Sequence, residues 1–328
     1  MTYTMNKAAK LFLHTFTLLL QIAWGTANLS AKTSTVEQSA SLLDDGRIIC
    51  VIGDSGTGDN NALAVAHALE SMNCSQIRIL GDIIYPSGIE SAEDPLLQRN
   101  LLGPYQYFID RDIPIFIVLG NHDHKQNSEA WIEVAKQHPL LKFPNYYYAE
   151  DWGEICFFNL DSSFYEKIYF AHKRYAQTRW LRKALDTVKN SCKFSIATGH
   201  HPYRSSGGHG NASWQLSLFF EEELIGKIDM YLSGHDHHLS DEGTAGGTRL
   251  LISGAAGAHK YDLKEASEDK QFAISEYGFL IIQFSRDQQN DIVARYKFYS
   301  LIPDGKGGYT DLKEVWSGLK KGQGIRNN

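Results

Sequence analysis

The sequence predicts an α/β fold in which β-sheet is covered by helices. Five apolar runs, each ending at a glycine, have the length and composition of buried strands; they are residues 47–53, 77–81, 113–120, 194–199 and 228–234. Helical patterns lie between these runs, at residues 62–72, 95–109, 128–138, 177–189 and 213–225. Alternation of strand and helix is typical of sheets whose faces are covered by helices.

Other segments have hairpin character. Residues 146–150 and 155–160 are predicted strands joined by the turn at 151–154, and further strand patterns cover residues 248–253, 277–284 and 292–300. No linker, repeat or low-complexity block interrupts the sequence. We therefore expect one domain, residues 42–328, in which the Gly- and Lys-rich residues 305–328 are partly loose.

The composition limits the kind of partner. The chain has 328 residues, a formal net charge of −6 and 21 % charged residues. It lacks the excess of basic residues that sequence-independent nucleic-acid binding requires. We therefore expect small or individually captured substrates. The sequence leaves the oligomeric state open.

Residues 1–31 have the pattern of an export signal. Two lysines precede the mostly apolar residues 11–24, and small residues follow around Ala27 and Ala31, where we expect cleavage. The mature chain would then be periplasmic or secreted. An uncleaved membrane anchor is the weaker alternative, because a bilayer span needs about 20 apolar residues. No other segment is long and apolar enough to span a membrane.

The chain has four cysteines and no C-x-x-C pair that would indicate a thiolate metal site; they are Cys50, Cys74, Cys156 and Cys192. In an exported protein these residues can form one or two disulfides, and the sequence does not assign the pairing. Buried free thiols are an equally strong alternative, because Cys50 and Cys156 lie within apolar runs.

Metal-binding side chains are concentrated at the ends of the five apolar runs. The segments are Gly53-Asp54-Ser55-Gly56, Gly81-Asp82-Ile83-Ile84-Tyr85, Gly120-Asn121-His122-Asp123, Gly199-His200-His201-Pro202 and Gly234-His235-Asp236-His237. Open α/β sheets bind ligands in the crevice at the carboxyl ends of their strands, so these loops can meet there. Together they supply oxygen and imidazole ligands for two metal ions, and a metal pair activates water against a phosphate ester.

This set of segments resembles that of the purple acid phosphatases, within the calcineurin-like metallophosphoesterase superfamily. The small, tartrate-resistant type is the most similar, and the resemblance runs from Gly53 to about Gly257. It implies a four-layer αββα sandwich of two mixed β-sheets flanked by helices. It also implies a binuclear centre of Fe(III) with Fe(II), Zn(II) or Mn(II), in a single metallophosphoesterase catalytic domain.

The resemblance assigns the metal ligands position by position. The ferric ligands would be Asp54, Asp82, Tyr85 and His237, and the divalent ion would be held by Asn121, His200 and His235, with Asp82 bridging both ions. Hard oxygen donors suit trivalent iron, and imidazole and amide donors suit the divalent metals. Tyr85 best distinguishes the purple acid phosphatases from the rest of the superfamily, because many other members have an Asp-x-His pair and no tyrosine ligand. Here the second residue after Asp54 is Gly56.

Two further histidines match positions beside the metals. His122 resembles the family's histidine that contacts the phosphoryl group and the leaving oxygen, and His209 resembles a second one, nine residues after His200. A protonated imidazole there can stabilise developing charge or donate the leaving-group proton.

Three neighbouring histidines are not assigned as ligands: His124, His201 and His238. The family pattern G-H-x-P selects His200, although a slip of one position to His201 stays open. We expect Asp123 and Asp236 to orient ligand imidazoles rather than to bind metal.

The resemblance thus implies an acid phosphatase that hydrolyses phosphate monoesters by attack of a metal-bound hydroxide at an Fe(III)-M(II) centre. The first alternative is an exported phosphodiesterase or nucleotidase of the same superfamily. The second, from another class, is a metal-stabilised binding protein without catalytic activity. The sequence does not identify the physiological substrate or the second metal.

Overall fold

The computed structural model describes residues 35–37, 43, 46–264 and 269–326. All of them belong to one folding unit, Ser34–Asn328. The export signal expected at residues 1–31 lies outside the described residues and stays a prediction. Among the residues that are described, no helix combines the length and the apolar character needed to cross a membrane.

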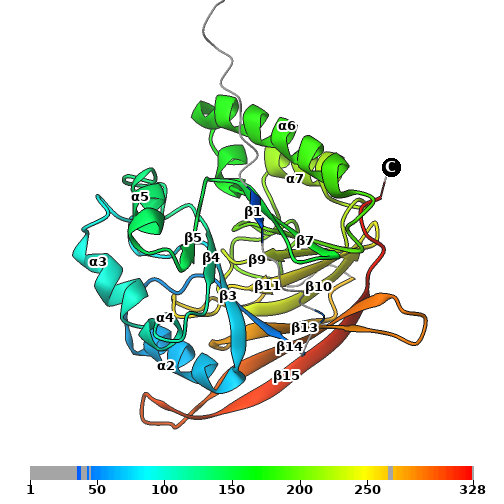
Figure 1. The fold of residues 1–328 in the computed structure, drawn as a ribbon. Coiled ribbons are helices and arrows are strands. Elements are labelled where there is room, and N and C mark those ends of the chain that lie inside the picture. The colour runs from blue at the N-terminus through cyan, green and yellow to red at the C-terminus, as the bar shows by residue number, and fades with distance from the viewer. Residues whose placement is uncertain (1–34, 38–42, 44–45, 265–268, 327–328) are drawn as a thin grey trace, which may run out of the picture. The chain divides into compact units, whose positions relative to one another are not determined.

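The described strands form two mixed sheets (Figure 1). One has the order β1-β6-β7-β8-β9-β11-β10-β12, with β1 Thr35–Glu37, β6 Tyr148–Asp151, β7 Ile155–Asn159, β8 Phe194–Thr198, β9 Met230–Ser233, β11 Thr248–Ser253, β10 Leu239–Ala245 and β12 Phe272–Ile274. The other has the order β15-β14-β13-β2-β3-β4-β5, with β15 Tyr309–Lys321, β14 Ile292–Pro303, β13 Gly278–Arg286, β2 Ile48–Ile52, β3 Cys74–Leu80, β4 Ile115–Val118 and β5 Leu141–Lys142.

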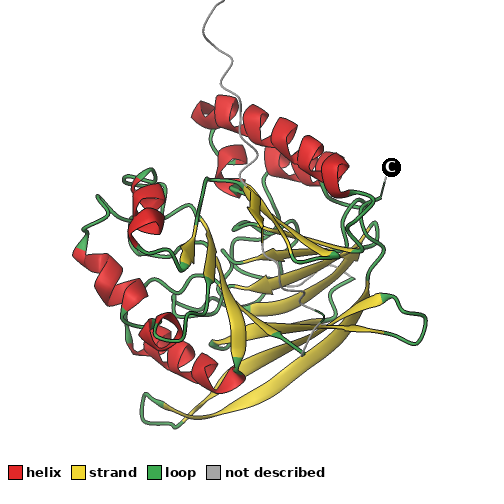
Figure 2. Ribbon diagram, in the orientation of Figure 1, coloured by secondary structure: helices red, strands yellow, loops and turns green. Residues whose placement is uncertain are grey.

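Helices flank both sheets (Figure 2). Those that flank the sheet containing β7 are α6 (Ala171–Val188) and α7 (Trp214–Glu223), and those that flank the sheet containing β3 and β4 are α2 (Asn60–Leu69), α3 (Pro95–Leu97), α4 (Gln106–Ile109) and α5 (Ala130–Gln137). The predicted fold class, an αββα sandwich of two mixed sheets with flanking helices, is confirmed.

Strand register brings the loops predicted to bind metal to one level. β2, β3 and β4 run parallel, with Ile79 paired to Ile52 on one side and to Ile117 on the other. In the other sheet β8 and β9 are also parallel, and Thr198 pairs with Leu232. Because parallel strands end at the same edge of a sheet, the loops after each group leave the sheet together.

Two sequence-based expectations about the fold need correction, and one seven-residue strand was missed. The helix expected at 95–109 is broken into α3, a π-helical turn at Gln98–Leu102 and α4. Pro104 explains the break, because proline has no backbone N–H to continue the helical hydrogen bonds. The tail at 305–328 is not loose over most of its length, because β15 pairs with β14 along the strand. β10 was not predicted.

A buried ion pair joins the two sheets. Arg78 of β3 donates to both carboxylate oxygens of Glu150 of β6, at 3.0 and 2.8 Å, and the two side chains are 1 % and 0 % exposed. The Arg78 guanidinium also lies 3.4 Å from the ring centroid of Phe157. A paired charge at such a position is costly to unpair, so this contact ties the two sheets together.

The cysteines form two disulfides, Cys50–Cys74 and Cys156–Cys192, with Cα–Cα distances of 5.7 and 5.9 Å. This resolves the alternatives that the sequence left open. The first bridge links β2 to β3, and the second links β7 to the residues just before β8. Each bridge therefore ties two neighbouring parallel strands that deliver or support one of the loops predicted to bind metal.

Candidate metal centre

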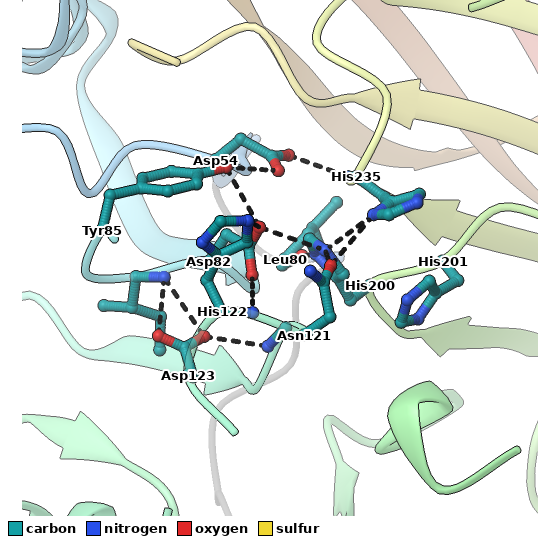
Figure 3. A network of polar contacts seen from close by, with 12 residues as sticks. Asp54, Leu80, Asp82, Tyr85, Asn121, His122, Asp123, His200, His201 and His235 are labelled. Atoms are coloured by element: carbon teal, nitrogen blue, oxygen red, sulfur yellow. Dashed lines mark hydrogen bonds and ion pairs between the residues drawn. The ribbon is translucent and has the colours of Figure 1, made fainter. Parts of the chain in front are cut away.

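The five predicted loops meet at the carboxyl ends of their strands (Figure 3). Those after β2, β3 and β4 come from one sheet, and those after β8 and β9 come from the other. The seven residues predicted as metal ligands are all brought together there, in two groups that share Asp82. Their roles as ligands stay a prediction, while their convergence is an observation.

The first group surrounds the Tyr85 phenol. Tyr85 Oη lies 3.1 Å from Asp54 Oδ1, 3.0 Å from Asp82 Oδ2 and 3.2 Å from His237 Nε2. His237 Nε2 in turn lies 3.5 Å from Asp54 Oδ1. Three oxygens and one nitrogen thus point at one common position.

The second group surrounds the Asn121 side-chain carbonyl. Asn121 Oδ1 lies 3.0 Å from His200 Nε2 and 3.1 Å from His235 Nδ1, and those two nitrogens are 3.2 Å apart. His200 Nε2 also lies 3.5 Å from Asp82 Oδ2. The same Asp82 oxygen therefore borders both groups, as a bridging carboxylate would.

Hydrogen bonds to backbone carbonyls orient two of the imidazoles so that the lone pair on Nε2 faces the centre. His200 Nδ1 donates to the carbonyl of Leu80 at 2.8 Å, and His237 Nδ1 donates to the carbonyl of His259 at 2.6 Å. A neutral imidazole that donates through Nδ1 keeps an unshared electron pair on Nε2. Both Nε2 atoms face the groups described above, so they are ready to bind cations.

Three residues in these loops adopt backbone conformations that are uncommon outside glycine. Asp54, Asp82 and His235 have positive φ angles of 59°, 50° and 70°. Such angles are uncommon for residues with a Cβ and are concentrated at functional sites. Gly120 allows a close approach, because a Cβ at this position would overlap Asp82 Oδ1.

Asp123 and Asp236 do not orient the ligand imidazoles through hydrogen bonds, contrary to expectation. Asp123 accepts from the backbone N–H groups of Ile83, Ile84 and Gly120, which holds two of the loops together. Burial, followed by the nearby Asp82 carboxylate, raises the pKa of Asp123 to about 7.

Asp236 organises the loop that carries His209. It accepts from the hydroxyl of Ser205 and, at 2.8 Å, from the backbone N–H of His209. Both aspartates therefore shape backbone around the centre.

The donor set fits two cations on electrostatic grounds. Burial, followed by the Asp54 and Asp82 carboxylates, raises the pKa of the Tyr85 phenol well above its usual value. Bringing two carboxylates and a phenol together in a buried site is unfavourable unless positive charge lies between them. A cation there would reverse the local effect and favour the phenolate.

The two predicted catalytic histidines border the centre. The backbone N–H of His122 donates to Asp82 Oδ1 at 2.8 Å, its Nδ1 donates to the carbonyl of Pro86 at 2.7 Å, and its Nε2 lies 3.9 Å from Asp82 Oδ2. The ring centroid of His209 is 4.4 Å from that of His235. Each imidazole therefore lies beside one donor group without being a member of it.

Sequence reasoning missed Tyr261. Its ring stacks on His237, with centroids 4.9 Å apart and an interplanar angle of 21°, and meets His209 edge-on at 5.3 Å. It lies in the loop after β11, where no motif drew attention to it. Its contacts join one predicted ligand to one predicted catalytic histidine.

The remaining spare imidazoles have other partners. His124 Nε2 lies 2.6 Å from Asp161 Oδ2, and His238 Nε2 lies 3.0 Å from the hydroxyl of Ser240. His201 Nδ1 lies 2.8 Å from the hydroxyl of Ser162, although its ring stays close to the second group.

The sequence profile of the calcineurin-like phosphoesterase family matches residues 48–239, which span all five loops. The chain belongs to the calcineurin-like phosphoesterase family. It is similar to purple acid phosphatase 4 of Arabidopsis thaliana, with 26 % identity over 302 residues that cover 83 % of this chain and 85 % of that relative. It is also similar to tartrate-resistant acid phosphatase type 5 of Sus scrofa, with 26 % identity over 213 residues that cover 60 % and 62 %.

Solved structures share the fold of this family member. GAP50, the anchor in the inner membrane complex of Plasmodium, matches with a TM-score of 0.67 and 20 % identity, covering 86 % of this chain and 89 % of that one. A dimetal phosphatase from Danio rerio matches with a TM-score of 0.52 and 13 % identity, covering 83 % and 99 %. At these identities the likeness concerns the fold alone.

Proposed function

We propose that this phosphoesterase is an exported acid phosphatase that hydrolyses phosphate monoesters at a binuclear Fe(III)-M(II) centre. The observation that carries the proposal is the grouping of Tyr85 with Asp54, Asp82 and His237 beside a second group that shares Asp82. A phenol oxygen in the first group separates this centre from metallophosphoesterases that lack a tyrosine ligand. The similarity to purple and tartrate-resistant acid phosphatases supports the same activity.

The donor chemistry supports two different ions. Three hard oxygens and one imidazole in the first group favour trivalent iron, whereas the amide and imidazoles of the second group favour Fe(II), Zn(II) or Mn(II). When bound, the two ions would supply an activated water and neutralise phosphate charge.

The chain's own residues complete the chemistry. His122 has its Nδ1–H committed to the Pro86 carbonyl, which fixes the ring beside Asp82 with Nε2 toward the centre. His209 is held at the other group through its backbone bond to Asp236. Because its Nδ1–H is committed, His122 can donate from Nε2 only as a protonated imidazole; in that form it can donate a hydrogen bond or a proton to a phosphate or leaving-group oxygen, as His209 can from the other group.

Rates on p-nitrophenyl phosphate and on bis-p-nitrophenyl phosphate test the proposal. A monoesterase hydrolyses the first with the larger kcat/KM. A larger kcat/KM on the diester would contradict it and favour the phosphodiesterase alternative. Metal-loaded protein that is inert toward both esters between about pH 4 and pH 8, a range that brackets histidine titration, would favour a binding protein.

The non-catalytic alternative has one observation behind it, since the fold is shared with GAP50, an anchor. Fold alone does not decide function. Catalysis is favoured because all seven predicted ligand positions and both catalytic histidines are occupied by the required residue types in this chain.

Export is part of the proposal. The N-terminal pattern of residues 1–31 supports it, and so do the two disulfides, because disulfides persist in oxidising compartments. N-terminal sequencing of protein recovered from outside the cytoplasm should begin after Ala27 or Ala31. A mature chain that retains Met1 would contradict the proposed cleavage.

A further inference from the structure

His201 lies beside the second donor group without belonging to the predicted ligands. Its ring centroid is 4.9 Å from that of His200 and 4.5 Å from that of His235. One ring nitrogen of each of these three histidines lies within 4.8 Å of the others. These distances alone therefore do not show whether His201 is a third imidazole ligand of the second group or has a different role.

Ser162 decides which His201 nitrogen carries the proton. Ser162 Oγ accepts from the backbone N–H of His200 at 3.2 Å and of His201 at 2.9 Å, and it lies 2.8 Å from His201 Nδ1. A hydroxyl has two acceptor lone pairs and one hydrogen. Because the two amides take both lone pairs, the hydroxyl hydrogen is donated to Nδ1. The neutral His201 ring then carries its own hydrogen on Nε2.

This tautomer leaves His201 without a free lone pair for a metal. Nδ1 accepts from Ser162, and Nε2 is a donor. The neighbouring His200 has the opposite arrangement, because its Nδ1–H donates to the Leu80 carbonyl and its Nε2 keeps the lone pair. Two adjacent histidines are thus fixed in complementary states, one for binding a cation and one for donating a hydrogen bond.

The Nε2–H of His201 opens on a cavity beside the centre. Within the described part of the chain, His201 Nε2 has no hydrogen-bond partner, yet it is not among the enclosed side-chain atoms that lack one. His201 lines a cavity of about 240 Å³ together with His209 and His235. This cavity adjoins the second donor group and has room for part of a phosphate ester.

We propose, on the basis of the phosphatase function argued above, that His201 is a substrate-binding residue whose Nε2–H donates to a phosphate oxygen. Phosphoryl transfer spreads negative charge over the non-bridging oxygens, and a donor that is already oriented toward them stabilises that charge. Ser162 acts through His201 as a positioning residue. The assignment removes His201 from the metal ligands and adds a donor beside His200 and His235, whereas His122 lies beside Tyr85.

Two variants separate the possible roles. His201→Phe keeps a ring and removes the donor, and His201→Gln returns an amide donor of similar reach. Elemental analysis of the purified proteins should give unchanged metal content for both variants. Calorimetry should show that His201→Phe binds inorganic phosphate about 10- to 100-fold more weakly than the wild type, because it loses one hydrogen bond to a charged acceptor. His201→Gln should recover part of this affinity. His172→Phe, on the exposed face of α6, is the matched control and should match the wild type.

Two results would overturn the proposal. Loss of one metal equivalent in a folded variant would make His201 a ligand, and unchanged phosphate affinity in His201→Phe would leave it without a role. If the variants fail to fold, ¹⁵N NMR of the wild-type protein loaded with zinc decides, because the His201 signal must be that of a protonated Nε2. Phosphate binding requires no turnover, so a protein inert toward all monoesters would refute the phosphatase function and still report on His201.

Discussion

The Asp82 carboxylate and the Tyr85 phenol, three positions apart in one loop, bring their oxygen atoms within 3.0 Å of each other. The same Asp82 oxygen lies 3.5 Å from His200 Nε2. One carboxylate therefore borders both donor groups, and it should affect the binding of both proposed ions. Asn121 borders the second group alone.

Asp82→Asn should reduce the content of both metals, whereas Asn121→Ala should reduce the second metal and keep the first. The reason is that the amide in Asp82→Asn removes the negative charge that both ions share. Elemental analysis of purified protein measures this, with Asp186→Asn on α6 as an exposed control. An Asp82→Asn variant with wild-type metal content would show that the carboxylate is no bridge.

His122→Ala should lower kcat on a phosphate monoester by roughly 10²- to 10⁴-fold, the usual contribution of a positioned acid or base. Metal content should stay unchanged, because the contact with Asp82 Oδ1 is made by the His122 backbone N–H, which alanine retains. Full activity in this variant would remove His122 from the catalytic residues. Loss of metal would instead assign it to the ligand set.

Glu150→Gln should lower the free energy of unfolding by about 3–5 kcal/mol, because it leaves the buried Arg78 charge without its counter-ion. Urea unfolding measures the change. Glu133→Gln breaks the exposed pair with Lys136, whose side chains are 51 % and 68 % exposed, and should cost less than about 1 kcal/mol. Equal effects of the two substitutions would contradict the role given to the inter-sheet pair.

The stability contributed by His124 should be lost as the pH rises. Burial alone would lower the pKa of His124, but the Asp161 carboxylate outweighs it and raises the pKa above its usual value. A histidine with a raised pKa in the folded state stabilises the fold fully below its unfolded pKa of about 6.5, and this contribution disappears as the pH passes the folded value.

The Tm difference between wild type and His124→Gln should therefore be larger at about pH 5.5 than at about pH 9, on either side of that titration. Differential scanning fluorimetry measures it. His172→Gln, on an exposed turn of α6, should show a small difference that does not change with pH. A His124→Gln difference that grows with pH would contradict the stabilising pair between protonated His124 and Asp161.

The sequence predicted the sheet-and-helix framework well because its strands are buried on both faces. Ile48–Ile52 is apolar throughout, Phe194–Thr198 is mostly apolar and buried throughout, and both runs stop at a glycine, which fixes the strand and the loop after it. β15 was missed because exposed residues alternate along it and only one partner strand, β14, holds it. The sequence of such a strand therefore lacks the apolar pattern from which buried strands are predicted.

The sequence was sufficient to predict the loops of the site, but not the groups that hold their side chains in place. Asp54 and Tyr85 belong to short local motifs, which can be recognised in a single sequence. The carbonyl of His259 and the hydroxyl of Ser162 act through contacts between distant segments, which only a folded chain brings together. The disulfide pairing was undetermined for the same reason, since it depends on which strands are neighbours.

The most direct test of the central claim combines elemental analysis with the visible absorption spectrum of the wild-type protein and of Tyr85→Phe. The account predicts iron together with a second metal in the wild type, and a charge-transfer band that the tyrosine substitution abolishes. An active wild-type protein that contains no iron, or a band unchanged in Tyr85→Phe, would contradict the assignment of Tyr85 as a ligand of ferric iron.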